Sequence, residues 1–217
     1  MYLFNSYKRK SLENEIGIYK YKAVIFDVDG TMYHLKKMYR IMFREVINYY
    51  FYHPQNFREI NIIIDFIKER EKHALEVVDD VENAQYEWTA IKHKISQQEV
   101  RELVERWIFQ VPLQHIYSCR RIKVIDLFNS LTIHGIPTGI FSDYPSEAKL
   151  KKLGLSTQCI VSATDPNVGR LKPDPKGLLL AANILGVSVE DCLLIGDRDD
   201  RDGECARRAG MEYFILD

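Results

Sequence analysis

Residues 21–31 read YKAVIFDVDGT, an apolar run that stops abruptly at two aspartates and a glycine. The strand-forming residues 21–26 predict a short buried β-strand, and the acidic stretch after it predicts a polar turn. Asp27 and Asp29 lie two apart, so on an extended chain their side chains point to the same side while Val28 points into the core. The spacing therefore predicts two carboxylates in one site.

The next two residues fit the same turn. Gly30 allows the backbone to bend sharply, and Thr31 offers a hydroxyl and an N–H to an anion. Taken alone, this pattern is equally typical of an acidic turn that only caps a strand.

The pattern of an apolar run followed by a polar turn recurs in the second half of the chain. Further strands are predicted at residues 137–141, 159–161, 192–195 and 212–216. Helices are predicted at residues 120–134, 146–153, 175–186 and 203–209. Alternating strands and helices predict an α/β fold with a parallel sheet covered on both faces. Ligands of such sheets bind beyond the carboxyl ends of the strands.

Residues 34–118 differ, because no strand signal occurs there and apolar residues recur at helical spacing. One stripe comprises Ile60, Ile63, Ile64 and Ile67, and a second comprises Val100, Leu103, Val104, Trp107 and Ile108. These stripes predict an all-helical insertion after the first strand, in which Pro54 and Pro112 mark helix boundaries. The aromatic run at residues 49–52, Trp88 and Trp107 are expected in its core rather than on a base-stacking surface.

The composition excludes several classes of protein. The chain has 217 residues, of which 46% are hydrophobic, and its 30 basic and 31 acidic residues give a net charge of −1. This excludes a disordered chain and gives no reason to expect a nucleic-acid partner. No apolar run of 18 residues occurs, so we expect no membrane partner and a cytoplasmic location. Residues 1–20, with basic residues 8–10, are expected to be a solvated extension. The four separated cysteines are expected to be buried, reduced thiols.

Polar residues also follow the later predicted strands. Ser142 and Asp143 follow the strand ending in GIF, Lys172 lies in GRLKPDP, and residues 197–203 read DRDDRDG. The acidic loop is not an EF-hand, because Arg201 and Arg208 occupy positions where that loop needs oxygen ligands. It suits magnesium, which is often held by one or two carboxylates. All these residues are predicted to lie at one edge of the sheet.

With DVDGT, FSD, GRLKPDP and IGDRDDRDG in this order, the sequence resembles the haloacid dehalogenase-like hydrolase superfamily. The resemblance covers residues 22–30 and about 120 to the end. It implies a Rossmann-like core of residues 21–33 and 119–217, with a helical cap of residues 34–118.

The resemblance also implies a role for each site residue. Asp27 would be the nucleophile, Asp29 would be a general acid and base that holds a proton part of the time, and Lys172 would offset the charge of Asp27. Thr31, Ser142, Asp143 and Lys172 would form the phosphate-binding site. Asp27, the carbonyl of Asp29, Asp197 and Asp202 would hold Mg²⁺.

One position departs from the family pattern, which often has asparagine after the serine. Asp143 stands there instead, as an extra carboxylate near the phosphate-binding position. We expect it to cap the helix that begins near Ser146.

These residues favour a Mg²⁺-dependent phosphatase that hydrolyses a small phosphorylated metabolite through an aspartyl-phosphate intermediate. An acid at Asp29 favours phosphate over halide release, because halide needs no proton. Two alternatives stay open: a phosphomutase resembling β-phosphoglucomutase, and a non-catalytic protein that binds a phosphate ligand. The residues after Thr31, Met32-Tyr33-His34, lack the Asp-Ser common in phosphoglycolate phosphatase-like members, so a sugar phosphate, phosphoglycolate or a nucleotide would all fit. The sequence gives no oligomeric state.

Overall fold

A parallel five-stranded sheet forms the centre of the protein. The structure, a computed structural model, describes residues 12–78 and 80–217, so the basic residues 8–10 lie outside the described residues. The strand order is β3-β2-β1-β4-β5, and all neighbouring strands are parallel. The strands are β1 (Ala23–Phe26), β2 (Thr138–Ser142), β3 (Cys159–Ser162), β4 (Cys192–Gly196) and β5 (Glu212–Ile215). The predicted α/β class and the positions of all five strands are confirmed.

Alternate residues of the strands face two separate hydrophobic clusters. In β1, Val24 and Phe26 pack on one side of the sheet, and Ala23 and Ile25 pack on the other. Each of these four side chains is fully buried, which explains why this strand is a continuous apolar run rather than an alternating one.

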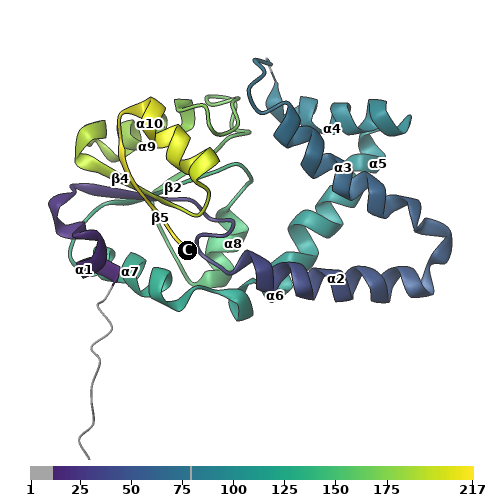
Figure 1. The fold of residues 1–217 in the computed structure, drawn as a ribbon, viewed down its shortest axis with the longest axis horizontal. Coiled ribbons are helices and arrows are strands. Elements are labelled where there is room, and N and C mark those ends of the chain that lie inside the picture. Colours follow the sequence, from purple (N-terminus) through teal and green to yellow (C-terminus); the bar gives the residue numbers. More distant parts are fainter. Residues whose placement is uncertain (1–11, 79) are drawn as a thin grey trace, which may run out of the picture.

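Helices cover both faces of the sheet (Figure 1). Side chains of α7 (Ile122–Ile133) and α8 (Glu147–Leu153) pack on the face that contains Val24. Side chains of α9 (Lys176–Leu185) and α10 (Glu204–Ala209) pack on the other face. The 3₁₀-helix η4 (Val189–Asp191) precedes β4.

The described part of the N-terminal segment packs on the core. Helix α1 (Leu12–Ile16) is followed by the 3₁₀-helix η1 (Ile18–Lys20). Ile18 is fully buried, and Leu12 and Ile16 pack against the cluster beside α7. For residues 12–20, the expectation of a solvated extension is therefore correct only in part: Glu15, Tyr19 and Lys20 are exposed, whereas Ile18 is buried and Leu12 and Ile16 pack on the core.

Between β1 and β2, every regular element of the described residues is helical. The elements are α2 (Leu35–Tyr52), the 3₁₀-helix η2 (Pro54–Asn56), α3 (Arg58–Lys72), α4 (Val81–His93), α5 (Gln97–Val104), the π-helix η3 (Glu105–Gln110) and α6 (Val111–Cys119). This helical insertion stands to one side of the sheet (Figure 1). Its two connections to the core run side by side, because the His34 N–H donates to the Cys119 carbonyl at 2.8 Å and the Arg121 N–H to that of Met32 at 2.9 Å.

The insertion has its own small core, and it differs in part from the sequence prediction. Ile62, Phe66, Val100 and Val104 pack together there, whereas Ile64 and Ile67 on the predicted isoleucine stripe are 43% and 41% exposed. The stripe is helical as predicted, but it is not the face that α3 buries in this core.

Prolines and aromatic residues of the insertion also follow the predictions only in part. Pro54 does begin a new element, but Pro112 lies where the backbone continues from a π-helix into α6 without a break. Trp107 is buried as expected, whereas Phe51 and Tyr52 are 73% and 71% exposed.

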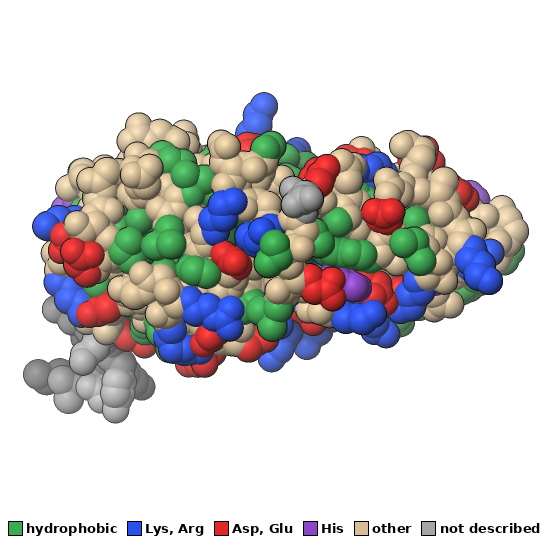
Figure 2. Space-filling view, turned by 90° about the horizontal axis from the view of Figure 1, so that it is seen from above, with side chains coloured by type: hydrophobic (Ala, Val, Ile, Leu, Met, Phe, Trp, Pro, Cys, Tyr) green, Lys and Arg blue, Asp and Glu red, His purple; other side chains and the backbone are tan. Residues whose placement is uncertain are grey.

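The surface carries charges of both signs. Seen from above, acidic and basic side chains alternate with hydrophobic ones over both halves of the molecule (Figure 2). No helix among the described residues is long and apolar enough to cross a membrane. All four cysteines are free and buried, as the sequence predicts.

Candidate active site

The turn after β1 places two carboxylates in one cavity. The backbone N–H of Asp27 donates to the Ile195 carbonyl of β4 at 2.9 Å, which continues the sheet pairing beyond Phe26. Val28 is fully buried in the core, whereas Asp27 and Asp29 both line the cavity. This arrangement is the one that the two-residue spacing predicts.

Gly30 and Thr31 shape this turn. Gly30 has a φ of +95°, and a Cβ atom at this position would lie 2.0 Å from Oδ2 of Asp197. Only glycine therefore allows the first turn to approach the acidic loop. The Thr31 hydroxyl is buried and donates to Oδ2 of Asp27 at 3.1 Å, so in this structure it orients the carboxylate of Asp27.

Lys172 lies between two carboxylates. Its side chain is 3% exposed, and its Nζ lies 2.7 Å from Oδ1 of Asp27 and 2.7 Å from Oδ1 of Asp202. Burial alone would lower the pKa of this amine, but the charges of Asp202 and Asp27 outweigh burial and raise it. Burial also raises the pKa of Asp27 well above its usual range, against the attraction of Lys172. A permanently charged Lys172 thus stabilises the carboxylates that burial disfavours.

Ser142 and Asp143 join two loops beside Lys172. Ser142 is fully buried at the end of β2 and lines the cavity. Oδ1 of Asp143 accepts the backbone N–H of Lys172 at 2.9 Å. The expectation that Asp143 caps helix α8 is therefore wrong: the residue at that helix N-terminus is Ser146, and its N–H donates to the side chain of Glu147. Asp143 instead holds the loop that carries Lys172 against the end of β2.

Three carboxylates gather where the acidic loop meets the first turn. Asp27, Asp197 and Asp202 each offer an oxygen, and these atoms all lie within 4.8 Å of one another. Oδ2 of Asp202 accepts the N–H groups of Asp197 at 3.2 Å and Arg198 at 3.1 Å. Burial, followed by repulsion from Asp202, raises the pKa of Asp197 to about 6.

This cluster fits a divalent cation with oxygen ligands. Lys172 is the cation that contacts two of the three carboxylates, and Arg121 and Arg198 act on Asp197 from further away, yet the pKa values of Asp27 and Asp197 stay raised. Two unit charges 4 Å apart repel by roughly 4 kcal/mol at an effective dielectric constant of 20. Hard cations such as Mg²⁺ prefer carboxylate oxygens of this kind. The donor set therefore suits a metal beside the predicted nucleophile.

Asp29 has partners that the sequence analysis did not identify. Lys149 Nζ lies 2.6 Å from both carboxylate oxygens of Asp29, and the Tyr33 hydroxyl donates to Oδ1. Burial alone would raise the pKa of Asp29, but the charge and hydrogen bonds of Lys149 outweigh it and lower the pKa. The lowered pKa favours the ionised form of Asp29 in this structure.

A helical pattern in the sequence could have revealed Lys149. It lies one residue before Leu150 and four before Leu153 on α8, and all three side chains are buried. A lysine on the apolar face of a short helix directly after a predicted site strand is a signal for a buried ion pair.

The cavity has a volume of about 320 Å³ and lies between the core and the insertion. Its core wall comprises Asp27, Asp29, Ser142, Asp143, Lys172 and Asp197, with Lys149 beside them. On the opposite side, Arg70 of α3 donates to the Asp143 carbonyl at 2.8 Å and lies over the ring of Tyr144 at 4.1 Å. The insertion thus contacts the loop that holds Lys172.

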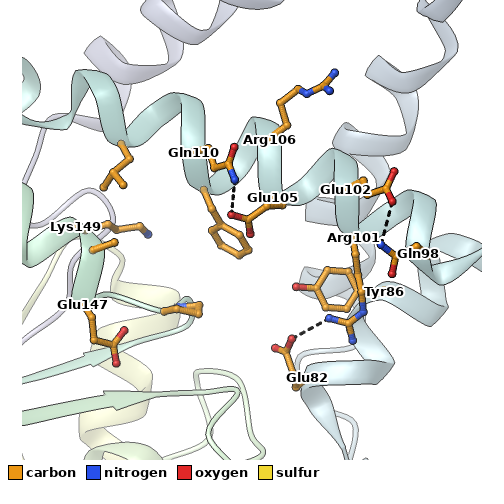
Figure 3. A pocket seen from close by; sticks show the side chains of 14 residues that line it. Glu82, Tyr86, Gln98, Arg101, Glu102, Glu105, Arg106, Gln110, Glu147 and Lys149 are labelled. Atoms are coloured by element: carbon orange, nitrogen blue, oxygen red, sulfur yellow. Dashed lines mark hydrogen bonds and ion pairs between the residues drawn. The ribbon is translucent and has the colours of Figure 1, made fainter.

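A second hollow of about 890 Å³ lies on the other side of Lys149. Figure 3 shows Lys149 and Glu147 at one end and a row of polar side chains of the insertion at the other. The polar groups of that row pair with one another, as in Arg101 with Glu82 at 3.2 Å and Gln110 with Glu105 at 2.9 Å. The carboxylate cluster does not line this hollow.

Comparison with curated proteins finds partial relatives that are phosphatases. The chain is 35% identical over 92 residues to a phosphoglycolate phosphatase of Xylella fastidiosa, which covers 41% of this chain and 40% of that protein. It is 35% identical over 90 residues to an N-acetylmuramic acid 6-phosphate phosphatase of Pseudomonas aeruginosa, which covers 40% and 39%. Each match thus spans about two-fifths of the relative's length.

Comparison with solved structures supports the fold. A 2-haloacid dehalogenase from Pseudomonas syringae pv. Tomato superposes with a TM-score of 0.62 at 17% identity, covering 90% of this chain and 86% of that chain. At this identity the likeness concerns the fold alone. The family model for haloacid dehalogenase-like hydrolases matches residues 21–210, which include the sheet, the insertion and the carboxylate cluster. With the four sequence motifs brought together at one edge of this sheet, the chain belongs to the haloacid dehalogenase-like hydrolase family.

Proposed function

We propose that this protein is a metal-dependent phosphatase that hydrolyses small phosphate monoesters at the core wall of the cavity. The observation that carries this proposal is Lys172, whose amine lies 2.7 Å from Asp27 and from Asp202, beside a third carboxylate. A buried carboxylate next to a fixed cation and a metal-binding cluster suits attack on a phosphoryl group, whose transfer depends on positioning and charge stabilisation. The phosphatase names of the partial relatives agree with it.

The residues divide the reaction between them. A carboxylate oxygen of Asp27 forms a bond to phosphorus while the bond from phosphorus to the ester oxygen breaks, giving an aspartyl phosphate. The leaving oxygen takes a proton from Asp29, which then accepts one from the water that hydrolyses the aspartyl phosphate. Because Lys149 keeps Asp29 ionised before substrate binds, the proton arrives with the ester. A phosphate monoester, with a second pKa of about 6, carries one in part of its population near neutral pH.

The negative charge of the phosphoryl group is compensated by Lys172, the Ser142 hydroxyl, the N–H groups of the turn and a metal. Asp27, Asp197 and the carbonyl of Asp29 would hold Mg²⁺, with Asp202 completing the cluster. When bound, the metal neutralises charge on the transferred phosphoryl group. Asp143 positions Lys172 through its backbone, so its part in phosphate binding is indirect. Residues 34–118 act as a cap over the core of residues 21–33 and 119–217, and they exclude bulk water from the cavity.

Release of phosphate from p-nitrophenyl phosphate tests this proposal. We expect release with Mg²⁺, none with a chelator, and a loss of about 10³-fold or more in Asp27→Asn. Asp126→Asn, an exposed aspartate on α7, is the matched control and should retain native activity.

The intermediate has its own test. Protein quenched with acid during turnover should carry a phosphoryl group on Asp27 that hydroxylamine removes. Phosphate release that persists unchanged in Asp27→Asn or in the presence of a chelator would contradict the proposed mechanism.

A further inference from the structure

The insertion wall of the cavity is mostly apolar. It includes Met42 and Val46 of α2, Ile63 and Ile67 of α3, and Trp107 and Ile108 of η3, and it also includes Tyr39, which carries a hydroxyl. Among the described residues of the insertion, Arg70 and Glu71 are the only charged side chains that line the cavity, and both lie at one end of α3. A substrate bound at the core wall would therefore place its leaving group against an apolar surface.

Packing accounts for only part of this surface, because Ile108 packs against the core of the insertion and Met42 against the core beside the sheet. Helix α3 already buries Ile62 and Phe66 in the core of the insertion. Ile63 and Ile67 lie on a different face and line the cavity, and Ile67 remains 41% exposed. Apolar side chains that line one wall of a cavity and stay partly exposed there, as Ile67 does, are typical of a ligand-binding surface.

The lysines around the cavity are paired with carboxylates, and Arg70 is hydrogen-bonded to uncharged groups. Lys172 contacts Asp27 and Asp202, and Lys149 contacts Asp29. Arg70 donates to the side chain of Gln85 and to the Asp143 carbonyl.

The two remaining cations belong to the acidic loop. Arg198 pairs with Glu71 and Asp200, and Arg201 donates to the Lys172 carbonyl. Among the described residues that line the cavity, Arg70 is thus the only cation without a carboxylate partner, and its side chain is 4% exposed and hydrogen-bonded to two uncharged oxygens. A second anionic group on a substrate would have to displace these hydrogen bonds to reach it, and burying the group without a cation is costly.

We infer that the cavity selects phosphate monoesters of uncharged, apolar alcohols or phenols, with a short alkyl chain or a single ring. This inference rests on the proposed phosphatase function, and it differs from the small anionic substrate named for one of the partial relatives. The core wall binds the phosphoryl group, and the insertion wall binds the carbon skeleton. The volume of about 320 Å³ is at the lower end for ligand cavities, which limits the size of this skeleton.

Binding of phosphonates to the native protein tests the inference without turnover. With Mg²⁺ present, calorimetry would compare methyl-, propyl- and hexylphosphonate with phosphonoacetate. We expect affinity to rise about threefold for each added methylene until the cavity is full. Propylphosphonate should bind at least about tenfold more tightly than phosphonoacetate. Affinity that is independent of chain length, or tighter binding of phosphonoacetate, would overturn the inference.

Two isoleucines on one helix provide a matched pair of variants. Ile67 lines the cavity and is 41% exposed, whereas Ile64 is 43% exposed and does not line it. Ile67→Lys should weaken hexylphosphonate binding by about tenfold or more and improve phosphonoacetate binding, and Ile64→Lys should change neither. Equal effects of the two variants would show that the insertion wall does not contact the ligand.

A parallel hydrolysis assay separates this inference from the proposed function. Chain-length-dependent phosphonate binding without phosphate release from any monoester would support the apolar site and contradict the phosphatase. Phosphate release that depends on Asp27, without any preference for alkyl over anionic groups in phosphonate binding, would support the phosphatase and contradict the apolar site.

Discussion

The two walls of the cavity differ in how their side chains are held. On the core wall, Asp27 pairs with Lys172, and Lys172 also pairs with Asp202 behind the wall; both contacts join residues far apart in sequence. On the insertion wall, Ile63 and Ile67 make contacts that are apolar and nondirectional, and Ile67 stays partly exposed. The fixed wall suits a reaction, because charged groups must be positioned before substrate arrives. The apolar wall suits selection among leaving groups, which needs shape and polarity more than orientation.

This division has a structural origin. The core wall is built from the carboxyl ends of β1, β2 and β4, which the parallel sheet brings together. The insertion wall is built from α2, α3 and η3, and its contact with the core includes Arg70. Substitutions on the two walls should therefore separate effects on the reaction from effects on selectivity.

Lys172→Met should have the largest effect. It leaves Asp27, Asp197 and Asp202 within 4.8 Å of one another without their lysine. Removing one partner of a buried ion pair typically costs about 3–5 kcal/mol, so we expect urea unfolding to show a loss of that size and activity to fall about 10³-fold. Lys176→Met, an exposed lysine nearby, should change neither. A fully stable Lys172→Met protein would show that the core wall does not depend on this charge.

Lys149→Met should have the next largest effect, and it acts through Asp29. Burial raises the pKa of Asp29 and Lys149 lowers it, so the variant raises this pKa. In the native protein the proton arrives with the ester, so kcat/KM for an alkyl phosphate should fall above the second pKa of the ester, about 6. In the variant Asp29 can hold the proton itself, so the descending limb of the pH profile should move to higher pH and kcat/KM at neutral pH should rise by about 10-fold to 100-fold.

Two controls make this prediction specific. Lys152→Met, on the exposed side of α8, should leave the pH profile unchanged. An aryl phosphate, whose leaving group needs little protonation, should be less sensitive to Lys149→Met. An equal shift for both substrates would argue against Asp29 as the acid.

The core wall could largely be predicted from the sequence. Asp27, Asp29, Ser142, Lys172 and Asp197 each lie at the end of a strand or in the loop after it, so the sheet topology alone places them at one edge. The pairing within this edge could not be predicted. The contact between Asp143 and the Lys172 backbone joins two loops 29 residues apart, and local spacing favoured a helix cap instead.

The insertion wall was harder to predict for a physical reason. Helical periodicity identifies an apolar face, but it does not state what that face contacts. The stripe that contains Ile63 and Ile67 predicted a helix but not its contacts: Ile62 and Phe66 supply the core, and Ile63 and Ile67 line the cavity. The signal in the sequence was that α3 carries two adjacent apolar faces, of which its core needs only one.

Arg70→Met should have a smaller effect, and it tests the connection between the two walls. Arg70 is 4% exposed, and its loss leaves the Asp143 carbonyl without this donor. We expect a loss of about 1–2 kcal/mol in the free energy of unfolding, together with a higher KM because the insertion is no longer held against the loop. Arg58→Met removes an exposed hydrogen bond from the same helix to the His93 carbonyl and should cost less than about 0.5 kcal/mol. Equal losses would mean that Arg70 does not connect the walls.

Asp197→Asn should have the smallest effect on stability, and its sign is diagnostic of the core wall. The folded protein raises the pKa of Asp197 to about 6, against about 3.9 for an unfolded chain. Without metal, the resulting stabilisation is complete below about pH 4 and is lost as the pH rises through 6. Asparagine does not ionise, so the variant does not lose this stability as the pH rises. After discounting for partial exposure, it should be more stable than the native protein at pH 8 by about 1 kcal/mol, or roughly 2–4 °C in Tm, and equally stable at pH 4.

Adding Mg²⁺ should reverse this order at pH 8. The native protein binds the cation through an ionised Asp197 and gains stability, whereas the variant has lost a carboxylate of the cluster. The gain of the native protein should shrink as the pH falls below about 6, because protons compete with the metal for this carboxylate. Thermal unfolding of both proteins across this range, with a chelator and with Mg²⁺, gives the four curves required. If the Tm values of the native protein and the variant change in parallel with pH in the chelator, repulsion among the carboxylates of the cluster is already relieved without a metal. The argument for a cation from the charge of these carboxylates would then be lost.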